Sequence, residues 1–290
     1  MAQAKIGVIG GTGLYNVEEL TDVEEINIDT PFGMPSDIII TGRLKGMVVA
    51  FLPRHGRGHN LMPTEVPFRA NIYALKSLGV EIIIAVNSVG SLKNEIKQGD
   101  LVIPDQLIDR TKSRVNTFFG NGIVGHIQFA EPFCPQLRQA LYKAAGVAGA
   151  NAHSKGTYIV MEGPAFSTKA ESHLHRCWGG DIIGMTALPE AKLAREAEIC
   201  YAIIACATDY DVWHETEEEV KVELILETMR RQEELCRQII KLSIPEIAGL
   251  TGCKCSETLK GAIVTVPEVI PETTKKKLDL LIGKYIHRGL

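Results

Sequence analysis

Three segments of the chain combine glycines with donors in a way that could bind an anion. Each follows an apolar run; they read Gly10-Gly11-Thr12-Gly13, Pro53-Arg54-His55-Gly56-Arg57-Gly58-His59 and Asn87-Ser88-Val89-Gly90-Ser91. Glycines let backbone N–H groups approach a ligand closely, and an arginine side chain offers a fork of donors that matches phosphate. A turn or loop without a ligand would explain the first and third segments equally well, so the cationic second segment carries most of this prediction.

A fourth segment, Thr208-Asp209-Tyr210-Asp211, places two acids directly after the apolar run Cys200–Ala207. Aspartate is disfavoured in strands, and a helix N-cap would account for only one of the two. The pair therefore indicates carboxyl groups held at the end of a buried strand for a ligand.

Apolar runs alternate with amphipathic stretches along the whole chain, and this alternation predicts an α/β fold. The expected strands are 5–9, 37–40, 47–52, 81–86, 101–103, 157–161, 182–183 and 200–207, and the expected helices are 67–78, 135–148, 168–177, 188–197, 216–242 and 273–285. Residues 111–131 have no clear period and are expected to form a long loop. We therefore predict one domain over residues 1–290, with a mixed, mostly parallel sheet flanked by helices. Ligands bind such sheets at the carboxyl ends of the strands, which is where the four polar segments fall.

The composition fits a protein of small-molecule ligands. With 31 basic and 35 acidic residues the net charge is −4, and no basic surplus points to nucleic acid or to an acidic membrane. No apolar run approaches the ~20 residues that a membrane helix needs, and no signal peptide is visible. We therefore expect a cytoplasmic location.

Seven cysteines stand at positions 134, 177, 200, 206, 236, 253 and 255. Five lie in apolar or helical stretches, where a buried free thiol is common. Cys253-Lys254-Cys255 lies in a segment flanked by glycine and serine. Two ligands alone do not make a zinc site, so no metal is predicted; the pair is expected to be two reduced surface thiols, or a disulfide if the source is a hyperthermophile.

Eight motifs, in order along the chain from residue 7 to about residue 245, resemble those of the trimeric nucleoside phosphorylases, most closely the members that act on 5'-methylthioadenosine. The resemblance is weaker over the tail 246–290, and Ala165 stands where close relatives have arginine. The motifs are Gly7-Val8-Ile9-Gly10-Gly11-Thr12-Gly13-Leu14, Thr30-Pro31-Phe32-Gly33, Arg54-His55-Gly56-Arg57, Gly90-Ser91-Leu92, Ala130-Glu131-Pro132-Phe133-Cys134-Pro135, Glu162-Gly163-Pro164, Gly184-Met185-Thr186 and Thr208-Asp209-Tyr210-Asp211.

The resemblance implies a role for each matching residue. Phosphate would be held by Thr12, Arg54, His55, Thr186 and the backbone of Asn87 and Ser88. Met185 would contact the ribose and Phe166 the purine, while Asp209, Tyr210 and Asp211 would bind the purine's N7 and 6-amino edge. His126, Val222 and Ile225 would line the pocket for the 5' substituent, with His126 reaching into the site of a neighbouring subunit.

The chemistry of nucleoside cleavage agrees with this layout. Phosphate must lie beneath C1' while the purine departs from the opposite face, through a transition state with oxocarbenium character. A purine anion is a poor leaving group, so a general acid near N7 is needed, and Asp209 is the candidate. Burial at the end of an apolar strand would raise its pKa, as this role requires.

Two features favour adenine over the 6-oxopurines. A 6-amino group donates a hydrogen bond, and a carboxylate accepts one. Relatives that act on 6-oxopurines have asparagine at the position of Asp209 and glutamate at that of Ser167. Val222 and Ile225 lie three residues apart on the predicted long helix, where an apolar pair suits a methylthio group, although the same face also packs on the core.

These inferences predict phosphorolysis of 5'-methylthioadenosine to adenine and 5-methylthioribose 1-phosphate in purine and methionine salvage. Inorganic phosphate would be a co-substrate, with no cofactor, in a trimer or a dimer of trimers. The Cys-x-Cys motif is reminiscent of archaeal thermophilic members, some of which have disulfides, and Cys134 with Cys200 is a second candidate pair.

Three alternatives remain. A broader purine nucleoside phosphorylase would also cleave adenosine and inosine. A dinucleotide-binding oxidoreductase is suggested by the spacing of Gly7, Gly10 and Gly13, but the acidic stretch 17–29 ending before Pro31 makes a poor crossover helix. A module without turnover would not need the intact set of phosphate and purine residues, and fold alone does not decide between the three.

Overall fold

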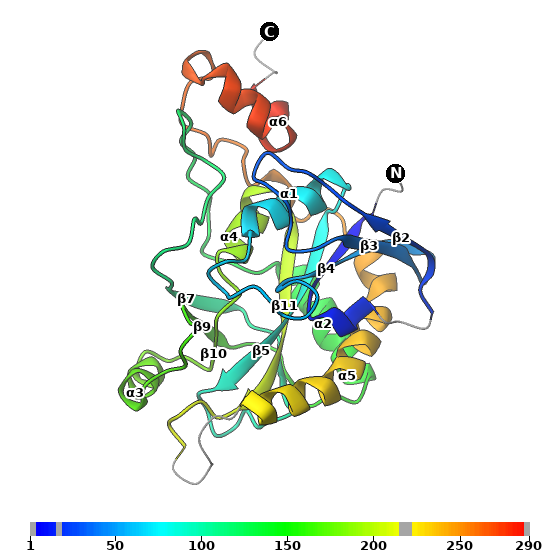
Figure 1. The fold of residues 1–290 in the computed structure, drawn as a ribbon, viewed down its shortest axis with the longest axis vertical. Helices are drawn as coiled ribbons and strands as arrows, with labels where there is room; N and C mark the ends of the chain where they lie inside the picture. The colour runs from blue at the N-terminus through cyan, green and yellow to red at the C-terminus, as the bar shows by residue number, and fades with distance from the viewer. Residues whose placement is uncertain (1–3, 16–18, 215–221, 287–290) are drawn as a thin grey trace.

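Four long parallel strands form the centre of the fold (Figure 1). The computed structural model describes residues 4–15, 19–214 and 222–286, without the side chains of residues 12, 15, 222–227 and 229–231. The strands lie in the order β4 (Met47–Pro53), β1 (Ile6–Gly10), β5 (Ile82–Ser91) and β11 (Cys200–Asp209). All four carboxyl ends therefore meet at one edge, and they carry the four polar segments predicted to bind ligand.

The remaining strands extend this centre on both sides. Two antiparallel strands, β3 (Ile39–Leu44) and β2 (Thr21–Ile26), continue from β4. On the other side the last part of β5 pairs antiparallel with β10 (Ile182–Gly184), which is followed by β9 (Thr157–Met161) and β7 (Gln106–Arg110), both parallel to it. Two short strands, β6 (Leu101–Val102) and β8 (Ala152–His153), pair beyond β11, so that the described residues form a mixed sheet of eleven strands.

The apolar run of β5 is buried because helices cover both faces of the sheet. Ile82 and Ile84 pack into the core under α2 (Pro135–Val147) and α5 (Val222–Ala248), whereas the alternate residue Ile83 packs on the opposite face. That opposite face is covered by α1 (Phe68–Ser77) and α4 (Glu190–Glu196). Side chains alternate between the two faces of a strand, so a run of isoleucines fits only a strand that is covered on both sides.

Two helices lie away from these layers (Figure 1). The helix α3 (Lys169–Cys177) begins with a capping box, in which Thr168 accepts a hydrogen bond from the N–H of Glu171 and the Glu171 carboxylate accepts one from the N–H of Thr168. The helix α6 (Glu272–Ile286) stands at the opposite end of the molecule, and its inner face buries Leu278 and Ile282. The described part of the chain contains no helix long and apolar enough to cross a membrane.

The structure confirms the mixed α/β sheet flanked by helices and corrects several boundaries. The strands β5 and β11 run on through residues 87–91 and Asp209, which were predicted to lie in loops beyond them. Three strands were not predicted: β2, β7 and β8. Residues 111–131 contain no helix or strand, as expected, and of the predicted helix 216–242 the residues 216–221 lie outside the described structure.

Candidate active site

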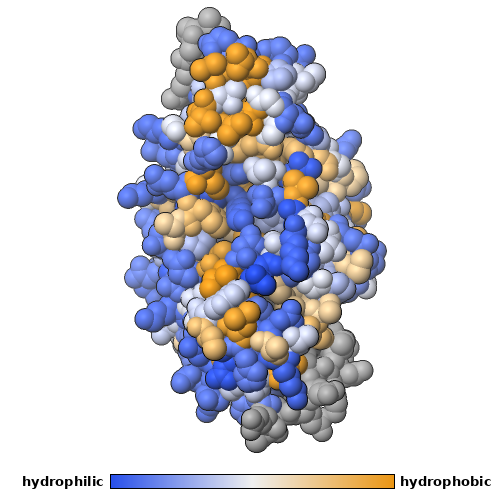
Figure 2. Space-filling model, turned by 90° about the vertical axis from the view of Figure 1, so that its left-hand side faces the viewer, coloured by the Kyte–Doolittle hydropathy of each residue, from blue (hydrophilic) through white to orange (hydrophobic). Residues whose placement is uncertain are grey.

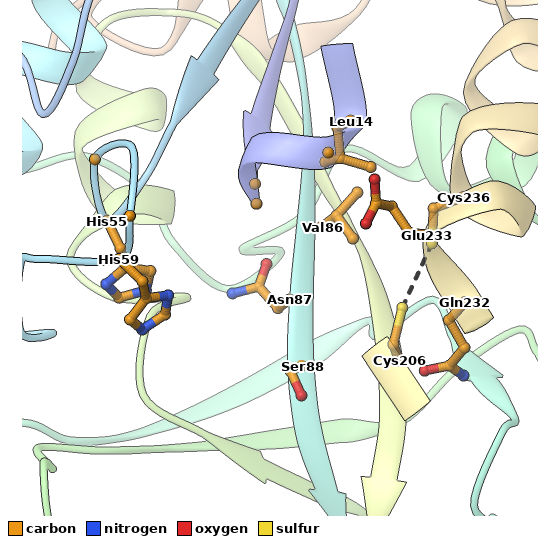
Figure 3. Close-up of a pocket in the computed structure, with 15 residues that line it drawn as sticks. Leu14, His55, His59, Val86, Asn87, Ser88, Cys206, Gln232, Glu233 and Cys236 are labelled. Atoms are coloured by element: carbon orange, nitrogen blue, oxygen red, sulfur yellow. Dashed lines mark hydrogen bonds between the residues drawn. The ribbon is translucent and has the colours of Figure 1, made fainter. Parts of the chain in front are cut away.

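A cavity of about 310 Å³ opens at the carboxyl ends of the central strands, between the first glycine segment, the loop after β4 and the helix α5 (Figure 3). His55 and His59 lie on one side of it, Asn87 and Ser88 on the strand behind it, and Glu233 on the opposite side. Three of the segments that were predicted to bind an anion therefore line one cavity.

The first glycine segment continues from β1 into a short 3-10 helix, Thr12–Tyr15. A Cβ atom at Gly13 would lie 1.4 Å from the Glu233 carboxylate, so this turn packs closely against the α5 side chain, which would have to move if the glycine were replaced. The Gly13 carbonyl accepts a hydrogen bond from Arg237, at 2.8 Å. The turn is thus fixed against α5, and Gly10, Gly11 and Gly13 border the cavity. The side chain of Thr12, a predicted phosphate ligand, lies outside the described structure.

Arg54, the strongest predicted anion ligand, forms a buried ion pair. Its guanidinium donates two hydrogen bonds of 2.9 Å to the Glu190 carboxylate, and both side chains are almost fully buried, at 3% and 0% exposed. It also donates to the Val86 carbonyl, at 2.9 Å. The charge expected to face phosphate is therefore balanced by Glu190, a residue that the sequence analysis did not single out, and Tyr201 donates a further hydrogen bond of 2.8 Å to the same carboxylate.

His55 is held as a neutral ring. Its Nδ1 lies 2.8 Å from the Leu61 carbonyl, which can only accept, so Nδ1 carries the proton. Burial, together with the nearby Arg54 charge, lowers the pKa of His55 to about 4. The ring stacks on that of His59, with 4.4 Å between the centroids. His55 therefore offers Nε2 as an acceptor near neutral pH, in contrast to the cation expected from the sequence.

Two hydrogen bonds connect β5 to its neighbours at the cavity. Asn87 donates to the Thr186 hydroxyl at 2.7 Å, so two predicted phosphate residues are joined directly. Ser88 donates to the Thr208 hydroxyl at 3.2 Å. The sequence analysis gave Asn87 and Ser88 roles through their backbone, but in the structure their side chains also belong to this network.

Asp209 continues this network. Its Oδ2 accepts a hydrogen bond of 2.8 Å from Thr208, and its Oδ1 accepts one of 2.8 Å from the N–H of Asp211. Burial raises the pKa of Asp209, although both hydrogen bonds oppose that shift. The pairing of β11 with β5 is irregular between Ala207 and Asp209, as at a β-bulge, and bulges often redirect side chains near active sites. This irregularity leaves Asp209 beside Gly90, where an added Cβ would lie 2.9 Å from Oδ1.

Asp211 follows with a left-handed backbone (φ 51°), a conformation that aspartate tolerates better than most residues. Burial raises its pKa, and the Ser172 and Ser167 hydroxyls partly offset the shift. Its Oδ2 is buried without a hydrogen-bond partner among the described atoms. A buried carboxylate oxygen without a partner is costly, and a ligand donor would satisfy it.

The other residues predicted to contact the nucleoside lie on the segments that flank these acids. Met185 is half-buried and packs on Gly163, where an added Cβ would lie 2.5 Å from its sulfur. Ser167 is buried, Phe166 is 44% exposed, and Tyr210 stacks on His214 at 4.7 Å. None of these residues borders the cavity of Figure 3 in the described structure.

The three residues predicted for the 5' substituent are His126, Val222 and Ile225. His126 is exposed on the loop 111–131, where its N–H donates to the Ala262 carbonyl, and it borders a different hollow. Val222 and Ile225 lie in α5, but their side chains lie outside the described structure.

The structure adds residues that the sequence analysis missed. Gln232, Glu233 and Cys236 line the cavity from α5, which was predicted as a helix without a stated role for them. Arg114, on the loop 111–131, is buried and donates to the carbonyls of Met185, Leu188 and Glu162. Arg114 thereby fixes the backbone around Met185, and nothing in its sequence neighbourhood indicated this.

Comparisons with known proteins agree with this geometry. Residues 5–245 match the family model described as the phosphorylase superfamily. The S-methyl-5'-thioadenosine phosphorylase of Geobacter sulfurreducens is 56% identical over 97% of this chain and 99% of its own, and the protein of that name from Synechocystis is 53% identical over 98% and 89%.

Solved structures give the same result. A methylthioadenosine phosphorylase from an Antarctic soil metagenomic library superposes with a TM-score of 0.93 and 47% identity, covering 97% of this chain and 99% of the other. A mutant adenosine/methylthioadenosine phosphorylase from Schistosoma mansoni, in complex with methylthioadenosine, superposes with a TM-score of 0.83 and 37% identity, covering 89% and 96%. The chain therefore belongs to the phosphorylase superfamily, among the S-methyl-5'-thioadenosine phosphorylases.

Proposed function

We propose that this chain catalyses the phosphorolysis of 5'-methylthioadenosine to adenine and 5-methylthioribose 1-phosphate. The observation that carries the proposal is the hydrogen-bonded series Ser88–Thr208–Asp209. It connects the cavity lined by glycines and His55 to a carboxyl group with a raised pKa. Phosphorolysis needs both parts, a pocket for the attacking anion and an acid for the departing base.

Phosphate would bind in the cavity between the glycine turn, His55 and Asn87. Backbone N–H groups at a glycine turn suit an anion without adding a charge that would have to be buried. The neutral Nε2 of His55 would accept a hydrogen bond from a phosphate hydroxyl, which would orient the phosphate so that an ionised oxygen faces C1'. Arg54 would act by positioning Asn87 and the strand ends rather than as a free cation, since its charge is balanced by Glu190. Thr12 and Thr186 would add hydroxyl donors.

Adenine would bind at the opposite end of this network. Asp209, whose pKa is raised by burial, would donate a proton to N7 as the glycosidic bond breaks, so that adenine leaves as a neutral base. The unpartnered Oδ2 of Asp211 would accept from the 6-amino group, an interaction that a 6-oxopurine cannot make. Met185 and Phe166 would contact the ribose and the purine face, with Tyr210 beside the two acids, and Ser167 would leave 6-oxopurines without a carboxylate partner.

Part of the site would come from a neighbouring subunit. We propose a homotrimer, or a dimer of trimers, in which His126 of one subunit reaches the 5' substituent bound by another, with Val222 and Ile225 lining the same pocket. Figure 2 shows small apolar groups among polar residues on the face that carries β7 and α3. Exposed apolar side chains such as Val115 and Val124, on the loop that also carries His126, support this arrangement.

The proposal extends to the co-substrate and the cellular setting. Phosphate serves as co-substrate, and the proposed chemistry uses no cofactor. We place it in the cytoplasm, in the salvage of purines and of the methionine carbon skeleton.

The test is adenine release from 5'-methylthioadenosine with and without inorganic phosphate, alongside adenosine and inosine. We expect release that depends strictly on phosphate and is fastest for 5'-methylthioadenosine. Cleavage of adenosine at a comparable rate would instead indicate a broader specificity for both nucleosides, as in the name of the Schistosoma adenosine/methylthioadenosine phosphorylase. Equal or faster cleavage of inosine, or release without phosphate, would contradict the proposal.

A further inference from the structure

Four cysteine sulfurs converge at a point away from the active site. Cys134 directly precedes α2, Cys200 begins β11, and Cys253 and Cys255 lie beyond the end of α5. The four Sγ atoms all lie within 4.8 Å of one another, and those of Cys134 and Cys253 are 3.4 Å apart. Three separate parts of the chain thus contribute one tetrad, in which the two cysteine pairs considered from the sequence come together.

The tetrad is built into the core. Cys134, Cys200 and Cys255 are at most 8% exposed, and Cys253 is half-buried. The expectation of two surface thiols is therefore wrong for Cys255. Five cysteines outside the Cys253-Lys254-Cys255 motif were expected to be buried, and of these only Cys177, at the end of α3, is exposed.

The size of the tetrad fits one tetrahedral ion. Sulfur ligands at about 2.3 Å from a central zinc ion would be about 3.8 Å from one another. An iron–sulfur cluster would hold its thiolates farther apart, because its own iron and sulfide atoms lie between them. Oxygen-seeking cations such as Mg²⁺ or Ca²⁺ would find no carboxylate ligand in this all-sulfur set. All four thiols are free in the structure, and pairwise disulfides alone would not require four sulfurs to meet at one point.

The surroundings offer positive charge to a tetrad of thiolates. Cys134 is the N-cap residue of α2, where the positive end of the helix dipole favours an anion. Cys200 and Cys253 also line a hollow bordered by Lys5, Lys76 and Lys284 and by two acids that pair with Lys5 and Lys284, Glu81 and Glu198. Zinc with four thiolates carries two net negative charges, and the helix dipole together with the excess of one lysine would offset part of them.

From this geometry we propose that Cys134, Cys200, Cys253 and Cys255 bind one Zn²⁺ ion as a closed structural site. The ion would tie the segment after α5 to the first residue of β11. Because Cys200 and Asp209 lie at opposite ends of the same strand, about 30 Å apart at 3.3 Å per residue, the ion takes no part in the reaction. Four protein ligands also leave no open position for a substrate.

The segment after the tetrad also packs on the core through apolar side chains such as Leu259, Leu278 and Ile282, which are buried. Leu259 donates to the Glu198 carboxylate at 3.1 Å, and Ile263 forms an isolated bridge with Gly125. Beyond them the chain continues to α6. A zinc ion would add one further tie at the start of this segment, which lies beyond the end of the family model at residue 245.

The first experiment measures metal in the wild-type protein. Protein purified under reducing conditions without chelator should contain close to one zinc per chain by elemental mass spectrometry. After exchange, Co²⁺ should give the intense visible and near-ultraviolet bands of tetrahedral thiolate coordination. Absence of zinc together with an octahedral cobalt spectrum would overturn the proposal.

The second experiment uses matched serine variants. Cys253→Ser, at the least buried of the four positions, should lose most of the zinc and lower Tm by several degrees, whereas Cys177→Ser should keep both. Intact mass under denaturing, non-reducing conditions tests the alternative of two disulfides. A chain four mass units lighter than the fully reduced form would show two disulfides and would overturn the zinc site. Neither result bears on phosphorolysis, so the site and the proposed function fail or stand separately.

Discussion

The strand β11 carries reactive side chains at both ends, and the two ends are built differently. At the carboxyl end Asp209 and Asp211 are only partly buried, and one Asp211 oxygen has no described partner. At the amino end Cys200 and Tyr201 are buried, and the Tyr201 hydroxyl donates to Glu190.

The carboxyl end of β11 is therefore suited to binding a ligand, and the amino end is suited to stabilising the fold. At the carboxyl end a substrate can donate to the carboxylate oxygen that lacks a hydrogen-bond partner. The raised pKa values of Asp209 and Asp211 suit proton transfer. At the amino end the polar Tyr201 hydroxyl instead donates its hydrogen bond to another protein group, the Glu190 carboxylate. Between the two ends runs a strand whose interior residues are all buried.

The largest effect is expected at the carboxyl end. Asp209→Asn removes the acidic proton while keeping the shape of the side chain, so kcat/KM for 5'-methylthioadenosine should fall by about 10²–10⁴-fold. Because an amide can donate to a 6-oxo group, the ratio of inosine to 5'-methylthioadenosine cleavage should rise. Steady-state kinetics of base release measures both quantities.

A matched control is Asp181→Asn, since the Asp181 carboxylate accepts from the N–H of Thr157 and pairs with Lys93 rather than with a residue of the site. It should leave kcat/KM within a fewfold of the wild type. If Asp209→Asn retains full activity while folded, the acid lies elsewhere and the carboxyl end loses its assigned role.

The next largest effect is expected in the free energy of unfolding, at Glu190, which accepts the hydrogen bond from Tyr201. Glu190→Gln would leave the buried Arg54 charge without its partner, which costs about 3–5 kcal/mol in the free energy of unfolding. Tyr201→Phe removes only one hydrogen bond to the same carboxylate and should cost about 1–2 kcal/mol. Urea unfolding at a fixed protein concentration compares the two, and equal losses would show that the Arg54 charge is balanced by another group.

The sequence predicted the carboxyl end well and the amino end poorly, for a physical reason. Apolar runs such as Glu81–Val86 mark buried strands, and ligands bind at the carboxyl ends of such strands, so the residues immediately after each run are the natural candidates. Glycine, histidine and paired aspartates then stand out locally. Glu190 does not, because an acid in an amphipathic helix is normally solvated, and only the fold places it beside Arg54.

The cysteine tetrad was missed for the same reason. Cys134 and Cys253 are 119 residues apart, so no spacing rule connects them. The strand β2 escaped notice because five of its six residues are exposed and three are acidic, a pattern without the alternation that marks a strand. The charge state of His55 also depends on contacts made across the fold, and the sequence suggested a cation where the structure holds a neutral ring.

The smallest effect is expected from the hydroxyl that joins the two parts of the site. Thr208→Val keeps the shape of the side chain and removes the hydrogen bond to Asp209, a bond that lowers the pKa of this carboxyl. Asp209 acts as an acid only while protonated, so activity falls as pH rises through its pKa. Without the hydroxyl the pKa rises further, and the basic limb of the pH profile of kcat/KM should move to higher pH by about one unit or less, since such a bond contributes about 0.5–1.5 kcal/mol. A limb that stays in place, or moves to lower pH, would mean that a group other than Asp209 governs it.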